Sequence, residues 1–246
     1  MTEAKRGVCV VIGAGDGLGA SVARAFAREK LAAVVTRRLR HLEQLGELAE
    51  GIRAEGGEAH AFGLDARKES DVVAFFDEVE RTIGPIEVMV FNIGANVRFP
   101  VTETTAQVYS KVWEMAAFAG FLAGREAARV MASRGRGTML FTGATASVRG
   151  GAGFSAFAGA KHALRALAQS LARELGPKGV HVAHVVIDGA IDGAFIRGLM
   201  PDAAEKRERE EILVPDAIAK NYVWLHRQER SAWTFEMDLR PWTETW

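Results

Sequence analysis

The chain has 246 residues, of which 48% are hydrophobic and 25% charged, as expected of one soluble domain with a substantial core. Lys and Arg together number 31, and so do Asp and Glu, so the net charge argues against nucleic acid or an anionic membrane as the main partner. The single cysteine, Cys9, cannot form an internal disulfide, and no apolar run approaches the roughly 18 residues of a membrane span, which together favour a reduced, cytoplasmic setting.

Apolar runs rich in Val and Ile alternate with helical patterns along most of the chain. This alternation is typical of right-handed crossovers, and it predicts an α/β fold with a parallel sheet covered by helices on both faces. We find no internal repeat or linker, so residues 1–246 are predicted to form a single domain. The expected strands are 8–12, 32–36, 59–64, 88–91, 138–142 and 181–187, and the expected helices between them are 18–30, 40–55, 69–83, 106–133 and 154–175.

The segment 192–213 departs from this alternation. It contains Met200-Pro201, followed by the charged run 205–211, which we interpret as the solvated face of a helix. We expect the whole segment to form a lid over a substrate site, although it carries no recognisable specificity pattern.

A last helix is expected from Pro215, and 235–239 reads as an edge strand. Three tryptophans, Trp233, Trp242 and Trp246, are concentrated in this tail. Aromatic side chains so grouped need burial, and a neighbouring subunit would supply it. We therefore expect residues 230–246 to lie at a subunit interface.

A glycine-rich turn joins the first strand to the first helix and reads Ile12-Gly13-Ala-Gly15-Asp-Gly17-Leu-Gly19. Glycines allow a tight turn and a close approach of the backbone to a pyrophosphate, and the helix N-terminus adds free N–H groups and a favourable dipole. In a first strand–helix unit this pattern predicts a dinucleotide site rather than a merely structural turn. The residues expected to contact the cofactor here are Gly13, Gly15, Gly17, Leu18 and Gly19.

The second strand ends in Thr36-Arg37-Arg38. A site that prefers NAD would place a carboxylate there, to bond the 2′-hydroxyl of the adenosine ribose. Two guanidinium groups would instead bind a 2′-phosphate, so the sequence favours NADP(H) over NAD(H). The alternative is that both arginines only cap the corner between strand and helix.

The spacing of Gly13, Gly17 and Gly19 resembles that of the short-chain dehydrogenase/reductase family, and the likeness continues over almost the whole chain. It implies a seven-stranded, doubly wound Rossmann-like sheet, a nicotinamide cofactor across the strand ends, and a small carbonyl or alcohol substrate. It also implies homodimers or homotetramers that pack through two long helices and the last strand. The further matching elements are Asp65-Ala66, where the family has the Asp that contacts the adenine amine, Asn92 and Gly94 after the fourth strand, Lys161, and Asp188-Gly189 in place of Pro-Gly.

Four family positions carry the catalytic residues, and only one of them matches. Phe157 stands in the place of the tyrosine that exchanges a proton with the substrate, and Ala144 in the place of the serine that orients it. Ala117 stands in the place of the asparagine that supports a proton-relay water, whereas Lys161 is kept. The resemblance therefore implies a cofactor site without the family's usual acid.

Two functions follow from this pattern. The first is an NADP(H)-dependent oxidoreductase with non-standard chemistry, in which Asp188, near the expected nicotinamide, is a candidate proton donor beside Lys161. For Asp188 the alternative is a turn-forming Asp-Gly pair. The second function is a catalytically silent protein that binds nucleotide or acts as a scaffold. We find no cluster of metal ligands.

Overall fold

Seven strands form one parallel sheet in the computed structural model, which describes residues 6–245. Their order across the sheet is β3-β2-β1-β4-β5-β6-β7, and every neighbouring pair is parallel. The strands are β1 (Val8–Ile12), β2 (Ala32–Arg37), β3 (Ala59–Gly63), β4 (Ile86–Phe91), β5 (Gly137–Thr142), β6 (Val180–Ile187) and β7 (Glu236–Leu239). The central strands are buried on both faces, which is why they read as continuous apolar runs.

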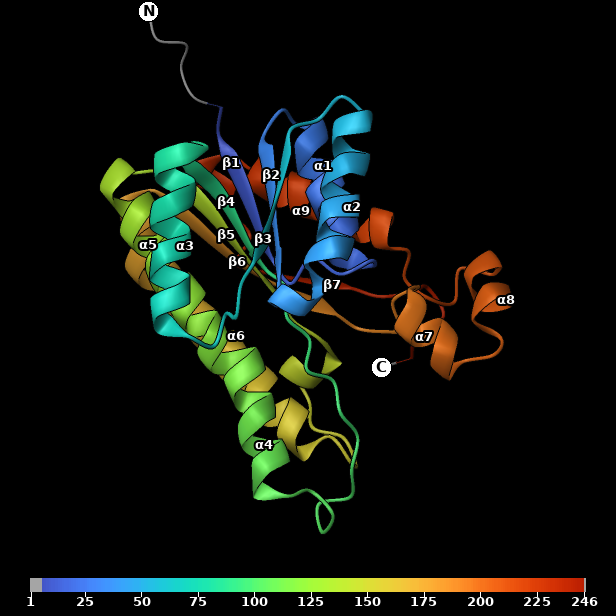
Figure 1. Ribbon diagram of the computed structural model, residues 1–246. Helices are drawn as coiled ribbons and strands as arrows, with labels where there is room; N and C mark the ends of the chain where they lie inside the picture. The colour runs from blue at the N-terminus through green and yellow to red at the C-terminus, as the bar shows by residue number, and fades with distance from the viewer. Residues whose placement is uncertain (1–5, 246) are drawn as a thin grey trace, which may run out of the picture.

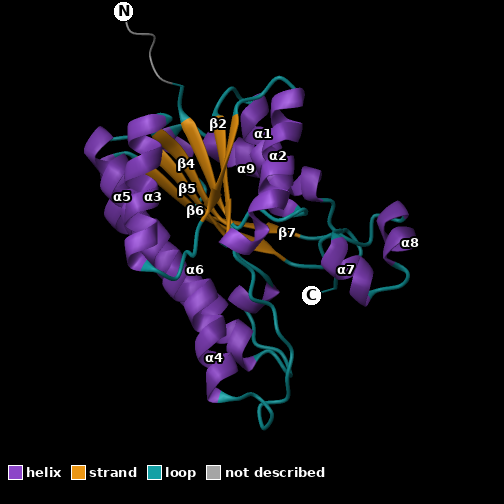
Figure 2. Ribbon diagram, viewed as in Figure 1, coloured by secondary structure: helices purple, strands orange, loops and turns teal. Residues whose placement is uncertain are grey.

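Helices cover both faces of the sheet (Figure 1, Figure 2). One layer holds α1 (Leu18–Arg28), α2 (Leu42–Ala54) and α9 (Pro215–His226), and the other holds α3 (Glu69–Thr82), α5 (Ala119–Arg134) and α6 (Ser155–Leu175). This confirms the predicted Rossmann-like class, and the expected bounds differ from the observed ones by at most two residues. Short 3₁₀ turns lie at Leu39–His41 (η1), Thr145–Ser147 (η3), Gly176–Lys178 (η4) and Arg230–Ala232 (η5).

The long helix expected at 106–133 is not uniform. It consists of α4 (Ala106–Trp113), a π-helical turn (η2, Glu114–Phe118) and α5. Apolar spacing does not separate these forms, because a π turn inserts one residue without breaking the run.

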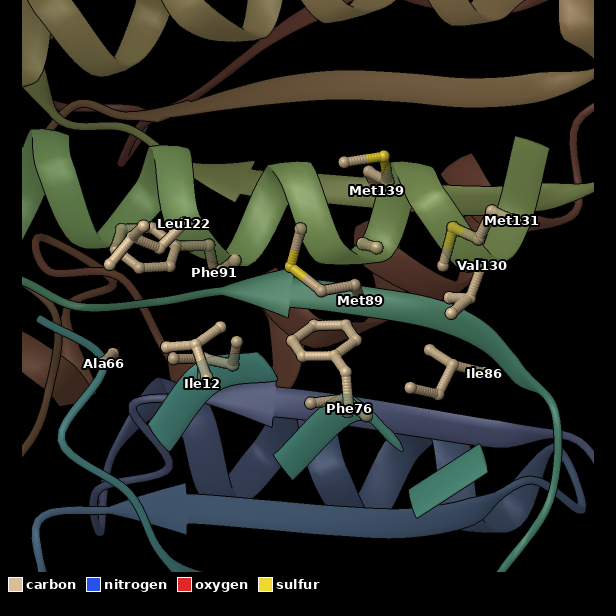
Figure 3. Close-up of a cluster of buried hydrophobic side chains, with 14 of the residues drawn as sticks. Ile12, Ala66, Phe76, Ile86, Met89, Phe91, Leu122, Val130, Met131 and Met139 are labelled. Atoms are coloured by element: carbon tan, nitrogen blue, oxygen red, sulfur yellow. The ribbon is translucent and has the colours of Figure 1, made fainter. Parts of the chain in front are cut away.

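The core is split by the sheet into two layers. Alternate residues of β1 face opposite sides, so that Val8, Val10 and Ile12 join one cluster and Cys9 and Val11 the other. In the first layer, side chains of α3 and α5 pack with those of β4 on one face of the sheet, and Figure 3 shows Phe76, Met89 and Leu122 among them. Cys9 is fully buried, so the structure gives it a packing role.

Two short helices, α7 (Ala194–Leu199) and α8 (Ala203–Glu208), lie in the segment for which the sequence predicts a lid, and they stand at one side of the sheet (Figure 1). The buried carboxylate of Asp192 holds both, because it pairs with Arg197 at 2.8 Å and with Arg207 at 3.1 Å. Most of the charged run is exposed, as predicted, and Arg207 in addition forms the ion pair with Asp192.

The sequence predicts burial of the C-terminal tail against a neighbouring subunit, but part of the tail packs on its own chain. Trp233 stacks on His181 of β6 at a centroid distance of 4.8 Å, and its Nε1 donates to the carbonyl of Gln228. Trp242 is 77% exposed, whereas Trp246 lies outside the described residues. Within residues 6–245, every helix is too short or too polar to cross a membrane.

Candidate active site

Two adjoining cavities lie at the carboxyl edge of the sheet, where the strand order reverses between β1 and β4. Their volumes are about 320 and 630 Å³. Gly17, Leu18, Asn92, Ile93 and Gly94 line both, so the two form one continuous site. The structure thus brings together in the first cavity every cofactor residue expected from the first four strands, namely Gly13, Gly15, Gly17, Leu18, Gly19, Thr36, Arg37, Arg38, Asp65, Ala66, Asn92 and Gly94.

Close backbone packing explains two of the four glycines of the loop, Gly13 and Gly19. Gly13 has φ of +97°, and a Cβ on it would lie 3.0 Å from the backbone of Asn92. A Cβ on Gly19 would lie 2.6 Å from the carbonyl oxygen of Gly13. The Asn92 side chain donates to that same oxygen at 3.0 Å and so ties the loop to β4. Gly17 precedes α1 without a side-chain cap, so the N–H groups of Leu18 and Gly19 stay open toward the loop, whereas that of Ala20 donates to the carbonyl of Gly15 at 3.0 Å.

The far end of the first cavity is basic, and Arg67 belongs to it. Its guanidinium grips Asp65 with two hydrogen bonds of 2.8 and 2.7 Å, and these bonds hold the pKa of Asp65 below its ordinary value. Burial, followed by repulsion from Arg40 and Arg67, lowers the pKa of Arg38. An anion bound here would relieve that repulsion. Arg67 was not among the residues predicted from the sequence, although its place two residues after Asp65 puts it in the same turn.

Lys161 lies on the wall of the second cavity and is 2% exposed. Its Nζ donates to the carbonyl oxygens of Thr142 at 2.9 Å and Ile93 at 3.2 Å. These two bonds leave its third N–H available. Burial lowers the pKa of Lys161 to about 8.

Two of the three positions assigned to missing catalytic residues also line this cavity. Ala144 and Phe157 contribute a methyl and a phenyl group, and the Phe157 ring centroid lies 5.9 Å from Nζ of Lys161. Ala117 lines neither cavity, because it is buried in the π-helical turn; Met115 of that turn reaches the first cavity instead.

Asp188 is not placed as a proton donor would be. It lines neither cavity, whereas Gly189 lines the second. Its Oδ1 accepts a hydrogen bond from Thr145 and lies 3.7 Å from Arg149, and its Oδ2 lies 3.4 Å from Arg240. Since both carboxylate oxygens are engaged and Asp188 itself does not line a cavity, we assign it no part in proton transfer, contrary to the expectation from sequence.

A second buried network lies behind Lys161. His184 is fully buried, and burial lowers its pKa to about 4 despite a 2.9 Å contact with Glu236. Arg165 of α6 grips Glu236 with two bonds and so ties β7 to the body of the protein. Among residues 6–245, no three His, Cys, Asp or Glu side chains gather as metal ligands would.

Comparison with known proteins agrees with the family resemblance seen in the sequence. The family model for short chain dehydrogenases matches residues 7–199. A short-chain dehydrogenase from Rhodopseudomonas palustris is 47% identical, with a TM-score of 0.82 over 96% of this chain and 99% of that one. A protein from Beutenbergia cavernae, whose structure contains NADP at low occupancy, is 25% identical with a TM-score of 0.85 over 96% of each chain.

A relative among the curated proteins is the uncharacterized oxidoreductase YuxG of Bacillus subtilis (strain 168), which is 30% identical over 89% of this chain. The chain spans 32% of the length of YuxG. The family match covers most of the sheet and both cavities, and the solved structures share the whole fold. The chain is therefore a member of the short-chain dehydrogenase family of oxidoreductases.

Proposed function

We propose that the protein is an NADP(H)-dependent oxidoreductase that acts on a small carbonyl or alcohol, with Lys161 as the source of the proton. The continuity of the two cavities supports this most, because one holds the glycine loop and the basic cluster and the other holds the lysine. Bound there, the cofactor would supply or accept the hydride. Titration of NADPH by fluorescence, followed by NADPH oxidation against a panel of carbonyl compounds, tests the proposal.

The side chains of Arg37 and Arg38 support the preference for NADP(H). Both line the first cavity, and Arg37 lies against the glycine loop, 4.0 Å from a Cβ built on Gly15. Within the described part of the chain neither guanidinium makes a hydrogen bond or ion pair. A capping role would require such partners, so their absence favours a 2′-phosphate as the group they bind.

Arg38→Gln is expected to weaken NADPH binding by roughly 10- to 100-fold, because it removes charge-assisted hydrogen bonds to the 2′-phosphate. NADH lacks that phosphate, so its dissociation constant should stay within about twofold of the wild-type value. Fluorescence titration measures both. Arg173→Gln is the control, since Arg173 is exposed, does not line the cavity and is not among the charges that act on Arg38. Tighter binding of NADH than of NADPH by the wild-type protein would contradict the assignment.

Lys161 is proposed as the proton donor after comparison with the other ionisable residues of the second cavity, Asp16, Arg149 and Asp192. Hydrogen bonding to Arg197 lowers the pKa of Asp192, Arg149 is too basic to release a proton, and Asp16 is exposed at the glycine loop. In reduction the carbonyl carbon gains a hydride and the oxygen gains a proton from Lys161. The neutral amine then recovers a proton from solvent.

A nucleotide-binding protein without turnover is the second candidate, favoured by the apolar side chains of Ala144 and Phe157. Tight NADPH binding without oxidation across the carbonyl panel would support it over the oxidoreductase. Failure to bind either nucleotide would exclude both.

An aromatic surface along α4 and α5 leads us to propose a homodimer or homotetramer. Tyr109, Trp113 and Phe121 are each more than 40% exposed, and Phe118 stacks between Trp113 and Phe121 at about 6 Å from each. Light scattering should give two or four times the chain mass of 26.6 kDa. Trp113→Ser with Phe121→Ser should raise the dissociation constant at least about 10-fold; a wild-type monomer would contradict the proposal.

A further inference from the structure

The second cavity has a mostly apolar wall, which favours a substrate with a hydrocarbon portion. Its apolar side chains come from the turn after β5, from the start of α6 and from the lid. They include Ala144, Ala146, Phe154, Phe157, Phe195 and Ile196. Apolar surface of this kind binds a hydrocarbon portion and gives little orientation.

Orientation requires a polar group, and most of the polar groups on this wall are already engaged. Asp192 is taken by Arg197 and Arg207, which also neutralise it. Lys161 donates to two carbonyl oxygens deep in the wall. Asp16 sits in the glycine loop, beside the expected pyrophosphate. The remaining ionisable residue of the wall is Arg149.

Arg149 follows η3 and is about half exposed at the cavity wall. Over residues 6–245 its guanidinium makes no hydrogen bond, and its one ion-pair contact is with Asp188 Oδ1 at 3.7 Å. Asp188 is itself held by Thr145 and Arg240. The Asp188 carboxylate therefore orients Arg149 without occupying its N–H donors. This gives the buried Asp188 a role although it does not line the cavity itself.

We propose that Arg149 binds a carboxylate on the substrate, so that the substrate class is a carbonyl compound with an apolar body and one carboxylate. The planar guanidinium offers two parallel N–H donors that match a carboxylate. A phosphate monoester carries nearly two charges, whereas Lys161, the second cation described on this wall, is 2% exposed and already donates to two carbonyl oxygens. The inference rests on the proposed function, since it places the carbonyl of the same molecule near Lys161.

A matched pair of probes tests it: 4-oxo-4-phenylbutanoate and its methyl ester. The wild-type protein should bind the acid more tightly than the ester in calorimetric titrations, with and without NADP⁺, and should reduce the acid with the higher kcat/KM. Arg149→Gln should lower affinity and kcat/KM for the acid by roughly 10- to 100-fold and leave those for the ester within about twofold. Arg149→Lys keeps the charge but loses the two parallel N–H donors, so its affinity and kcat/KM for the acid should lie between those of the wild type and Arg149→Gln.

Arg98→Gln is the charge-matched control. Arg98 lies over the Phe154 ring at 5.7 Å and is not part of the cavity wall, so its loss should not alter the ratio of acid to ester. The inference is overturned if wild-type protein treats acid and ester alike, binds neither, or loses both together in Arg149→Gln. Turnover of the ester with no advantage for the acid would overturn this inference alone, whereas failure to bind NADPH would overturn the proposed function.

Discussion

Lys161→Met is expected to lower NADPH-dependent carbonyl reduction by about 10²–10⁴-fold, the usual contribution of a positioned acid. The methionine fills the same buried volume but has no proton to give. Lys161→Arg provides the sharper comparison, because the arginine keeps the charge that could bind the cofactor and does not release a proton near neutral pH. We expect Lys161→Arg to bind NADPH within about threefold of wild type while losing most of kcat.

The pH profile distinguishes proton donation from a purely structural role. Lys161 must be protonated to act, and burial lowers its pKa to about 8, so wild-type kcat for reduction should be full near pH 6.5 and fall as the pH rises through about 8. The profile of the residual Lys161→Arg activity should lack that fall. Of the charged groups around it, His184 has a pKa lowered to about 4, and Asp188, Asp192 and Arg165 are held in ion pairs. If Lys161→Arg kept both the wild-type kcat and the wild-type profile, the lysine would not be the donor.

Phe157→Tyr combined with Ala144→Ser is expected to raise carbonyl reduction by about 10²-fold or more. Both side chains line the cavity that Lys161 lines, and the ring centroid of Phe157 is 5.9 Å from its ammonium group. A phenol there would stand beside a cation, which favours its ionised form and makes it a better acid than an isolated tyrosine. The serine would add a hydroxyl to orient the substrate oxygen. Steady-state kinetics under saturating NADPH measure the change.

Phe154→Tyr is the matched control for this gain. Phe154 lines the same cavity at the start of α6, so the variant adds the same hydroxyl to the wall without placing it on the Phe157 ring. It should leave kcat within about twofold. A double variant no faster than wild type would show that the missing hydroxyl groups do not limit the reaction. A gain from an inactive wild-type protein would identify the silent, nucleotide-binding alternative.

Local patterns in the sequence were sufficient for the architecture. The buried strands, the helices between them and the glycine turn each follow from residues close together in the chain, because strand and helix periodicity and the steric freedom of glycine are local properties. The expected cofactor residues came from the ends of successive strands, and the parallel sheet brings such ends to one edge. The sequence could therefore predict which residues gather there, and Arg67 was within reach of the same reasoning.

Partners distant in the chain were decided only by the tertiary structure. Asp188 read as an acid because its place at the end of β6 is local information, but its contacts with Thr145 and Arg240 depend on β5 and β7 lying beside that strand. The burial that lowers the pKa of Lys161 likewise arises from packing, and so does the 3.7 Å contact with Asp188 that orients the Arg149 guanidinium without a hydrogen bond. By itself the sequence determined the family's sheet and cofactor loop, whereas the tertiary structure decided which charges are paired and which face the cavity, since desolvation and ion pairing depend on neighbours that periodicity does not identify.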